Sequence, residues 1–166
     1  MQIEDAVCFS GSRAEKLPFS VSDGNEKYQS FLERLSGAVR EAAEEDYRIF
    51  YTGGCTGFDI LAGETVLGMK DEFPDLRLIA VLPFEEQANA WSEFWREKYF
   101  NLLERCDDVI TLQPKYTPGC YQRRNRYMVD RSSLVICCYH GKTGGTQSTV
   151  HYAEKMGLTV KRVEFL

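Results

Sequence analysis

Three glycine-rich stretches carry residue types that bind phosphate groups. They are Ser10-Gly11-Ser12-Arg13, the stretch 52–59 (Thr-Gly-Gly-Cys-Thr-Gly-Phe-Asp) and the stretch 141–146 (Gly-Lys-Thr-Gly-Gly-Thr). Glycine lets the backbone adopt positive φ and approach another group without a Cβ in the way. Where such a turn opens a helix, the first amides lack intrahelical partners and the helix dipole makes that end partly positive. The three stretches therefore predict anion-binding turns.

Side chains near these turns add charge and hydrogen-bonding groups. Arg13 offers a planar guanidinium that matches phosphate or carboxylate. Lys142 adds positive charge beside the third turn, and Asp59 can cap amides or accept hydrogen bonds from ligand hydroxyls. The P-loop order G-x-x-x-x-G-K-[ST] is absent, so ATP hydrolysis of the Walker type is not expected. The alternative for each turn is a tight connection whose glycines serve packing only.

Few residues are candidates for acid, base or nucleophilic catalysis. Asp59, Glu64 and His140 are titratable groups in or near the turns, and they are the candidates for acid or base. Cys55 can be a nucleophile at a helix N-terminus, although neither histidine is near it in the sequence. His151 lies inside the last predicted helix and is expected to be structural or on the surface. No group of His, Asp and Glu has metal-ligand spacing, so no metal site is expected.

A basic cluster lies within this acidic chain. It consists of Arg123, Arg124, Arg126 and Arg131. The cluster can contact a phosphate chain or single-stranded nucleic acid, or it can be a solvated helix face. Arg124 and Asn125 are expected to face the edge of a pocket.

Apolar patterning places these residues on alternating strands and helices. Strands are expected at 6–9, 48–52, 76–82, 108–112, 134–139 and 158–163. Helices are expected at 25–42, 58–73, 88–106, 121–131 and 147–156. In the third helix Trp91, Phe94 and Trp95 have the spacing of a buried stripe and are expected in the core.

The alternation of strands and helices predicts an α/β fold with a parallel sheet and helices on both faces. Right-handed crossovers place every strand-to-helix turn at one edge of such a sheet. Ligands bind at that edge, where the strand order reverses. We therefore expect the three glycine turns to converge around one ligand.

Composition restricts the class of protein further. The 166 residues suffice for one domain, expected to span 1–166, and the net charge of −5 does not favour a nucleic-acid wrapper or a protein of anionic membranes. No apolar run has the length of a membrane span, and no signal peptide is evident at the N-terminus. The six cysteines show no C-x-x-C spacing, which predicts reduced thiols in a cytoplasmic protein.

The order of the motifs resembles the SLOG superfamily, which joins the Smf/DprA DNA-processing proteins and the Lonely-guy nucleotide hydrolases. The motifs are Gly11-Ser12-Arg13, the stretch 52–59, Ile79 to Phe84, Arg124-Asn125-Arg126 with Asp130 and Ser132, and Gly144-Gly145-Thr146 with Thr149 and Ala153. The chain is most similar to the bacterial YpsA-like proteins (DUF1273). The resemblance implies a Rossmann-like three-layer sandwich with a mostly parallel sheet of about six strands. It also implies a bacterial cytosolic setting and a homodimer.

The turns and the resemblance together give a set of expected ligand-binding residues. They are Gly11, Ser12, Arg13, Thr52, Gly53, Gly54, Thr56, Gly57, Asp59, Pro83, Phe84, Arg124, Asn125, Gly144, Gly145, Thr146 and Thr149.

The leading hypothesis is the binding or sensing of a nucleotide or a nucleotide-derived ligand, such as one of the ADP-ribose type. Its phosphates are expected on the amides of Gly53-Gly54 and of Gly144-Gly145-Thr146, with Ser12 and Arg13 closing over them. One alternative is a Lonely-guy-like hydrolase that cleaves an N-glycosidic or phosphate bond. A second alternative is a DprA-like module that binds single-stranded DNA through the basic cluster.

Overall fold

Six parallel strands form the centre of the molecule in the computed structural model, which describes residues 5–141 and 144–166. The strands are β1 (Ala6–Gly11), β2 (Ile49–Thr52), β3 (Arg77–Leu82), β4 (Asp108–Thr111), β5 (Leu134–Cys138) and β6 (Thr159–Arg162). Their order across the sheet is β4-β3-β2-β1-β5-β6, and every pairing is parallel. In the register, Cys8 of β1 lies opposite Tyr51 of β2 and Val135 of β5.

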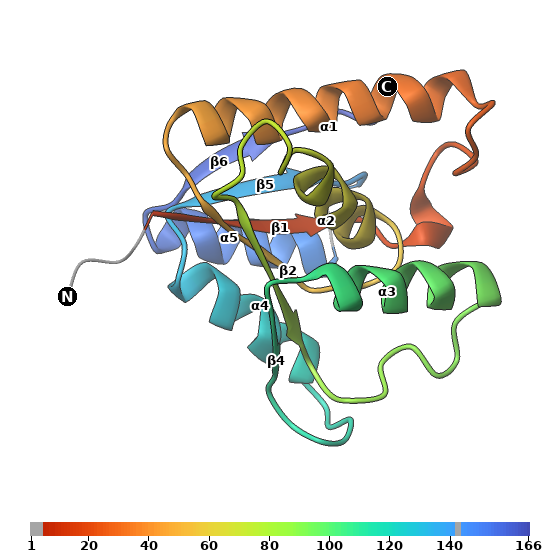
Figure 1. The fold of residues 1–166 in the computed structure, drawn as a ribbon. Coiled ribbons are helices and arrows are strands. Elements are labelled where there is room, and N and C mark those ends of the chain that lie inside the picture. The colour runs from red at the N-terminus through yellow and green to blue at the C-terminus, as the bar shows by residue number, and fades with distance from the viewer. Residues whose placement is uncertain (1–4, 142–143) are drawn as a thin grey trace.

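Helices cover both faces of this sheet (Figure 1). On one face lie α1 (Glu26–Glu44), α2 (Phe58–Gly68) and α3 (Glu93–Arg105). On the other face lie α4 (Cys120–Asp130) and α5 (Gly145–Lys155), while a short 3₁₀ turn, η1 (Ala14–Lys16), follows β1. The predicted α/β fold, a Rossmann-like three-layer sandwich, is confirmed.

The continuous apolar runs are strands that are buried on both faces. Along β1, Val7 and Phe9 point into the core beneath α1, α2 and α3, whereas Cys8 points into the core beneath α4 and α5. Strands of this kind need apolar residues at successive positions, because neither face meets water. The edge strands β4 and β6 are mostly exposed instead.

Three of the predicted helices agree with the structure to within two residues at each end, and two differ by more at one end. The second ends at Gly68 rather than at residue 73, because the Met69 and Lys70 amides donate to Val66 and Leu67 in tighter three-residue turns. The third begins at Glu93 rather than at residue 88. The reason is the cap, since the Ser92 side chain accepts a hydrogen bond from the Trp95 amide.

The later start of α3 changes the surroundings of its aromatic residues. Trp91 precedes the helix, and its ring contacts Tyr99 edge-on at 5.1 Å between centroids. Trp91 and Trp95 pack partly against the core, but Phe94 is 48% exposed. The prediction of a core position is therefore wrong for Phe94, because the buried side of α3 carries Tyr99 and Leu102, and a residue five positions before Tyr99 does not share that side.

Two of the glycine turns pack directly against each other at the carboxyl edge of the sheet. Gly57 has φ of +85°, and a Cβ at this position would lie 2.6 Å from both the Ser12 carbonyl oxygen and the Ala14 nitrogen. The neighbouring Phe58 amide donates to the Ser12 carbonyl at 3.0 Å. The loop after β1 is therefore held in place by the N-terminus of α2.

We expect Gly57→Ala to lower the free energy of unfolding by about 2–4 kcal/mol, because it combines a strained φ with a clash against backbone atoms. The matched control is Gly37→Ala on the exposed side of α1, where a Cβ meets no atom within 4 Å. The control should raise stability by about 0.5–1 kcal/mol. Urea denaturation measures both, and equal stability of the two variants would contradict the packing described here.

Candidate functional site

A cavity of about 210 Å³ opens at the carboxyl edge of the sheet, beside the ends of β1 and β5. The chain runs outward from β1 through β2, β3 and β4, and then returns to place β5 on the other side of β1. The strand order therefore reverses between β1 and β5. Ligands of open α/β sheets bind at such a reversal.

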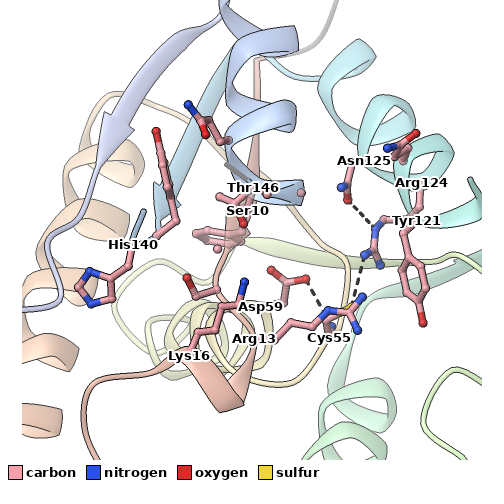
Figure 2. Close-up of a pocket in the computed structure, with 18 of the residues that line it drawn as sticks. Ser10, Arg13, Lys16, Cys55, Asp59, Tyr121, Arg124, Asn125, His140 and Thr146 are labelled. Carbon is pink, nitrogen blue, oxygen red and sulfur yellow. Dashed lines mark hydrogen bonds between the residues drawn. The ribbon is translucent and has the colours of Figure 1, made fainter. Parts of the chain in front are cut away.

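The structure brings many of the predicted residues together around this cavity (Figure 2). Nine of the expected ligand-binding residues line it, and so do Cys55 and the candidate catalytic residue His140. The nine are Gly11, Ser12, Arg13, Asp59, Arg124, Asn125, Gly144, Gly145 and Thr146. They come from the loop after β1, the start of α2, the first half of α4 and the N-terminus of α5.

Of the second glycine turn, only Cys55 and Asp59 line the cavity, and the rest of the turn supports it from behind. Its residues Thr52, Gly53, Gly54, Thr56 and Gly57 lie outside the lining. The Thr52 hydroxyl donates to the Asp59 carbonyl at 2.8 Å and accepts from the Gly54 amide at 3.3 Å. The Thr56 hydroxyl accepts from the Ala14 amide at 3.3 Å. These groups are thus used within the protein, and the Gly54 amide is already bonded.

Four further predicted residues also lie outside the lining. Pro83 is buried just beyond the end of β3, and the Phe84 ring contacts the cavity residue Tyr121. Thr149 accepts a hydrogen bond from the Asn125 amide group at 3.0 Å, which joins α5 to α4. Glu64 forms an ion pair with Lys98 of α3 at 3.2 Å, so its carboxylate is not placed to act with Asp59.

Arg124 points into the protein instead of belonging to a solvated basic face. It is 3% exposed, and its guanidinium donates to the Gly53 carbonyl at 2.6 Å and to the Cys55 sulfur at 3.4 Å. Its Nε also donates to the Asn125 side-chain oxygen at 2.8 Å. A Cβ on Gly53 would lie 2.5 Å from this guanidinium. The glycine at position 53 therefore makes room for an arginine of the protein.

Asp59 is a buried carboxyl group on the floor of the cavity. It is 7% exposed, and its Oδ2 accepts from the Cys55 amide at 3.4 Å. Burial raises the pKa of Asp59 to about 6, while Arg124, the Cys55 amide and Arg13 favour the ionised form and limit the rise. A carboxyl group with such a pKa can exchange a proton near neutral pH.

The N-terminus of α5 forms another wall of the cavity. Gly144 precedes the helix with φ of +138°, and among the described residues no side chain caps this end. Gly145, Thr146 and Gln147 of the first turn line the cavity. Backbone amides at such a helix start attract anions. Lys142, predicted to add charge here, lies outside the described residues.

Positive side chains border the mouth of the cavity. Arg13 and Lys16 are exposed residues of its lining, and the Arg13 guanidinium lies 4.7 Å from the centre of the Tyr121 ring. Lys16 and Tyr121 were not among the residues predicted from the sequence. A signal was available for Tyr121, because a residue three positions before Arg124 shares its side of a helix. Lys16 depends on η1, which the sequence did not indicate.

Other lining residues add polar groups to the same cavity. The lining residues that sequence reasoning missed also include Glu15, Gln122, Tyr139 and Gln147. His140 is exposed, and its ring packs against Phe165 with 4.6 Å between centroids. Within residues 5–141 and 144–166, no group of three His, Cys, Asp or Glu side chains could hold a metal ion. No helix in the same part of the chain is long and apolar enough to cross a membrane.

The raised pKa of Asp59 predicts a pH dependence of stability. Between about pH 4 and pH 6 the folded state keeps a proton that the unfolded state has lost, so stability falls as the pH rises through this window. Asp59→Asn removes the ionisable group. We expect the free energy of unfolding of this variant to exceed that of the wild type by roughly 1–3 kcal/mol above pH 6, with little difference below pH 4.

Urea denaturation across this pH range measures the difference. Asp75→Asn, at an exposed aspartate, is the control and should follow the wild-type profile. If the stability of Asp59→Asn changed with pH in parallel with that of the wild type, Asp59 would not be a buried carboxyl group with a raised pKa.

Comparisons with solved structures show a shared fold. DNA processing protein A from Streptococcus pneumoniae superimposes with a TM-score of 0.61 at 19% identity, over 95% of this chain and 50% of that one. The corresponding protein from Helicobacter pylori gives a TM-score of 0.51 at 16% identity, over 95% of this chain and 75% of that one. At these identities the likeness concerns the fold alone.

Relatives at higher identity are also bacterial. The SPbeta prophage-derived protein YoqJ of Bacillus subtilis is 32% identical over 137 residues, which cover 74% of this chain and 80% of YoqJ. A UPF0398 protein of Halalkalibacterium halodurans is 33% identical over 107 residues, which cover 63% of this chain and 57% of that protein. The match thus spans little more than half of the latter relative. The model of the YspA SLOG family matches residues 7–165, and the chain accordingly belongs to this family.

Proposed function

We propose that the cavity binds the phosphate end of a nucleotide or of a nucleotide-derived ligand. The observation that carries this proposal is the meeting of the α5 N-terminus with Arg13 and Lys16 at the strand reversal between β1 and β5. Amides at a helix start and a forked guanidinium both bind phosphate oxygens well in proteins. Membership of the SLOG family supports a nucleotide-related role.

Asp59 determines the orientation of the ligand in this proposal. Its carboxylate shares the cavity with the α5 N-terminus, and a phosphate placed directly against it would be repelled. The phosphate therefore lies toward Gly145 and Thr146, and Asp59 faces hydroxyl groups of the sugar. The carboxyl is also the candidate acid or base if the protein hydrolyses its ligand, because its pKa is about 6.

We expect Arg13→Ala to weaken the binding of ADP or ADP-ribose about 10- to 100-fold, because it removes charge-assisted hydrogen bonds to phosphate. Lys16→Ala should act in the same direction with a smaller effect, since lysine offers a point charge without a fork. Isothermal titration calorimetry measures both variants. Arg96→Ala, at an exposed arginine of α3 outside the cavity lining, is the control and should bind like the wild type.

Folded wild-type protein that binds none of the nucleotides tested would refute the proposal. Chromatography of a nucleotide after incubation with the protein separates binding from hydrolysis. Product in molar excess over protein would assign an enzyme activity to the same cavity.

A second candidate function is the binding of single-stranded nucleic acid along α4 and α5. One hollow is lined by residues of α4 and α5, and a second by residues of α4 and its two flanking residues. Gln122 lines both hollows as well as the main cavity. Arg126 stacks over Tyr152 at 5.2 Å, and Arg131 stacks over Tyr127 at 3.5 Å. DNA processing protein A of H. pylori binds single-stranded DNA. Basic and aromatic side chains in alternation suit a phosphate backbone with stacked bases.

Binding of this kind depends steeply on salt. We expect Arg126→Ala to reduce the slope of log affinity against log salt by about 1, because one phosphate contact is lost. Fluorescence anisotropy with a labelled oligothymidylate at several salt concentrations measures the slope. Lys70→Ala, at a lysine that pairs with Asp107 and lines none of these hollows, should leave the slope unchanged. No change in anisotropy with the wild type would eliminate this second function.

A further inference from the structure

We propose that the aromatic group of the ligand, the base of a nucleotide, stacks on Tyr116 beside the cavity. This inference rests on the proposed function, because it assigns a position to the second half of the same ligand. Three aromatic residues carry it, and we call them the aromatic cluster: Phe84, Tyr116 and Tyr121.

The aromatic cluster lies at the same edge of the sheet as the cavity. Phe84 follows the end of β3, Tyr116 lies in the loop after β4, and Tyr121 is in the first turn of α4. The Phe84 ring contacts Tyr116 at 5.7 Å and Tyr121 at 5.9 Å, both edge-to-face. The centroids of the two tyrosine rings are 6.5 Å apart. The parallel order of the sheet thus places all three rings on the side where ligands bind.

Tyr121 connects the aromatic cluster to the phosphate-binding groups. It lines the cavity, and its ring lies 4.7 Å from the guanidinium of Arg13. Figure 2 shows Tyr121 at one side of the cavity and His140 at the other, with Asp59 between them. A ligand whose phosphate contacts α5 and Arg13 can therefore extend past Tyr121 and reach Tyr116. A nucleotide has this shape, with its charge at one end and a flat ring at the other.

Tyr116 is exposed, yet its loop is firmly held. Its exposed fraction is 59%. On either side of it, the Gln113 side-chain amide donates to the Lys115 carbonyl and to the Thr117 hydroxyl, both at 2.7 Å. Arg123 in turn donates to the Gln113 side-chain oxygen at 3.0 Å. A loop that is held in place before the ligand arrives loses little conformational entropy on binding.

An exposed ring held in this way is suited to stacking. Stacking of a base on an aromatic side chain contributes about 1–3 kcal/mol and tolerates different bases. Phe94 is also an exposed aromatic residue, at 48%, but it lies on α3, contacts Trp95 and lines no part of the cavity. What distinguishes Tyr116 is thus its ring contact with Tyr121, which lines the cavity.

A matched pair of ligands tests this inference. ADP and inorganic pyrophosphate share a diphosphate, and only ADP carries a nucleoside. We expect ADP to bind the wild type more tightly than pyrophosphate does. Tyr116→Ala should weaken the binding of ADP roughly 5- to 100-fold and leave the binding of pyrophosphate unchanged. Tyr116→Phe keeps the ring and should bind ADP like the wild type. Calorimetry measures all of these affinities, with Phe94→Ala as the control for an exposed aromatic residue outside the site.

The outcomes separate the two proposals. If pyrophosphate binds and Tyr116→Ala leaves the preference for ADP intact, the stacking position is overturned and the phosphate site stands. If ADP and pyrophosphate bind the wild type equally, the stacking position is again overturned. If neither ligand binds and other nucleotides fail as well, the proposed function is refuted and the inference is refuted with it. Circular dichroism confirms that each variant is folded.

Discussion

The buried guanidinium of Arg124 is the interaction on which the candidate site depends. It joins α4 to the turn between β2 and α2. The helices α4 and α2 cover opposite faces of the sheet. A buried charge is costly unless polar groups surround it. Here the Gly53 carbonyl, the Cys55 sulfur and the Asn125 side chain accept its hydrogen bonds. The walls of the cavity are consequently fixed relative to one another before any ligand binds.

The glycines of these turns are of two kinds. At positions 53 and 57 the glycines admit other parts of the protein: the Arg124 guanidinium in one case and the backbone at Ser12 and Ala14 in the other. At Gly144 and Gly145 a Cβ would meet no described atom within 4 Å, so this turn stays open toward the cavity. Similar sequences thus serve different purposes, and the difference lies in what approaches each turn.

Local electrostatics at the site differ from those of the whole chain. The protein carries a net charge of −5, yet Arg13, Lys16 and Arg124 all border one cavity together with a helix N-terminus. Asp59 balances part of this positive charge, and its burial makes the balance sensitive to pH near neutrality. An acidic protein can therefore offer an anion site, because the field inside a cleft depends on the groups that line it.

Much of the fold follows from the sequence by itself. The spacing of apolar residues along the chain predicted the six strands and five α-helices that the described residues form, because strands buried on both faces and amphipathic helices have distinct patterns. The limits of α2 and α3 were less predictable, since they depend on a serine cap and on tight terminal turns. The motif order also predicted which loops lie at the ligand edge, because parallel strands with right-handed crossovers leave little choice.

The tertiary structure decided which residues of those loops face the cavity. A glycine has the same appearance in sequence whether it admits a phosphate, an arginine or a neighbouring backbone, so Gly53 and Gly145 could not be told apart. The place of Lys16 in the lining likewise depends on where the turn η1 lies in space. The sequence specifies local geometry through short-range forces, whereas access to a cavity depends on contacts between segments that are far apart along the chain.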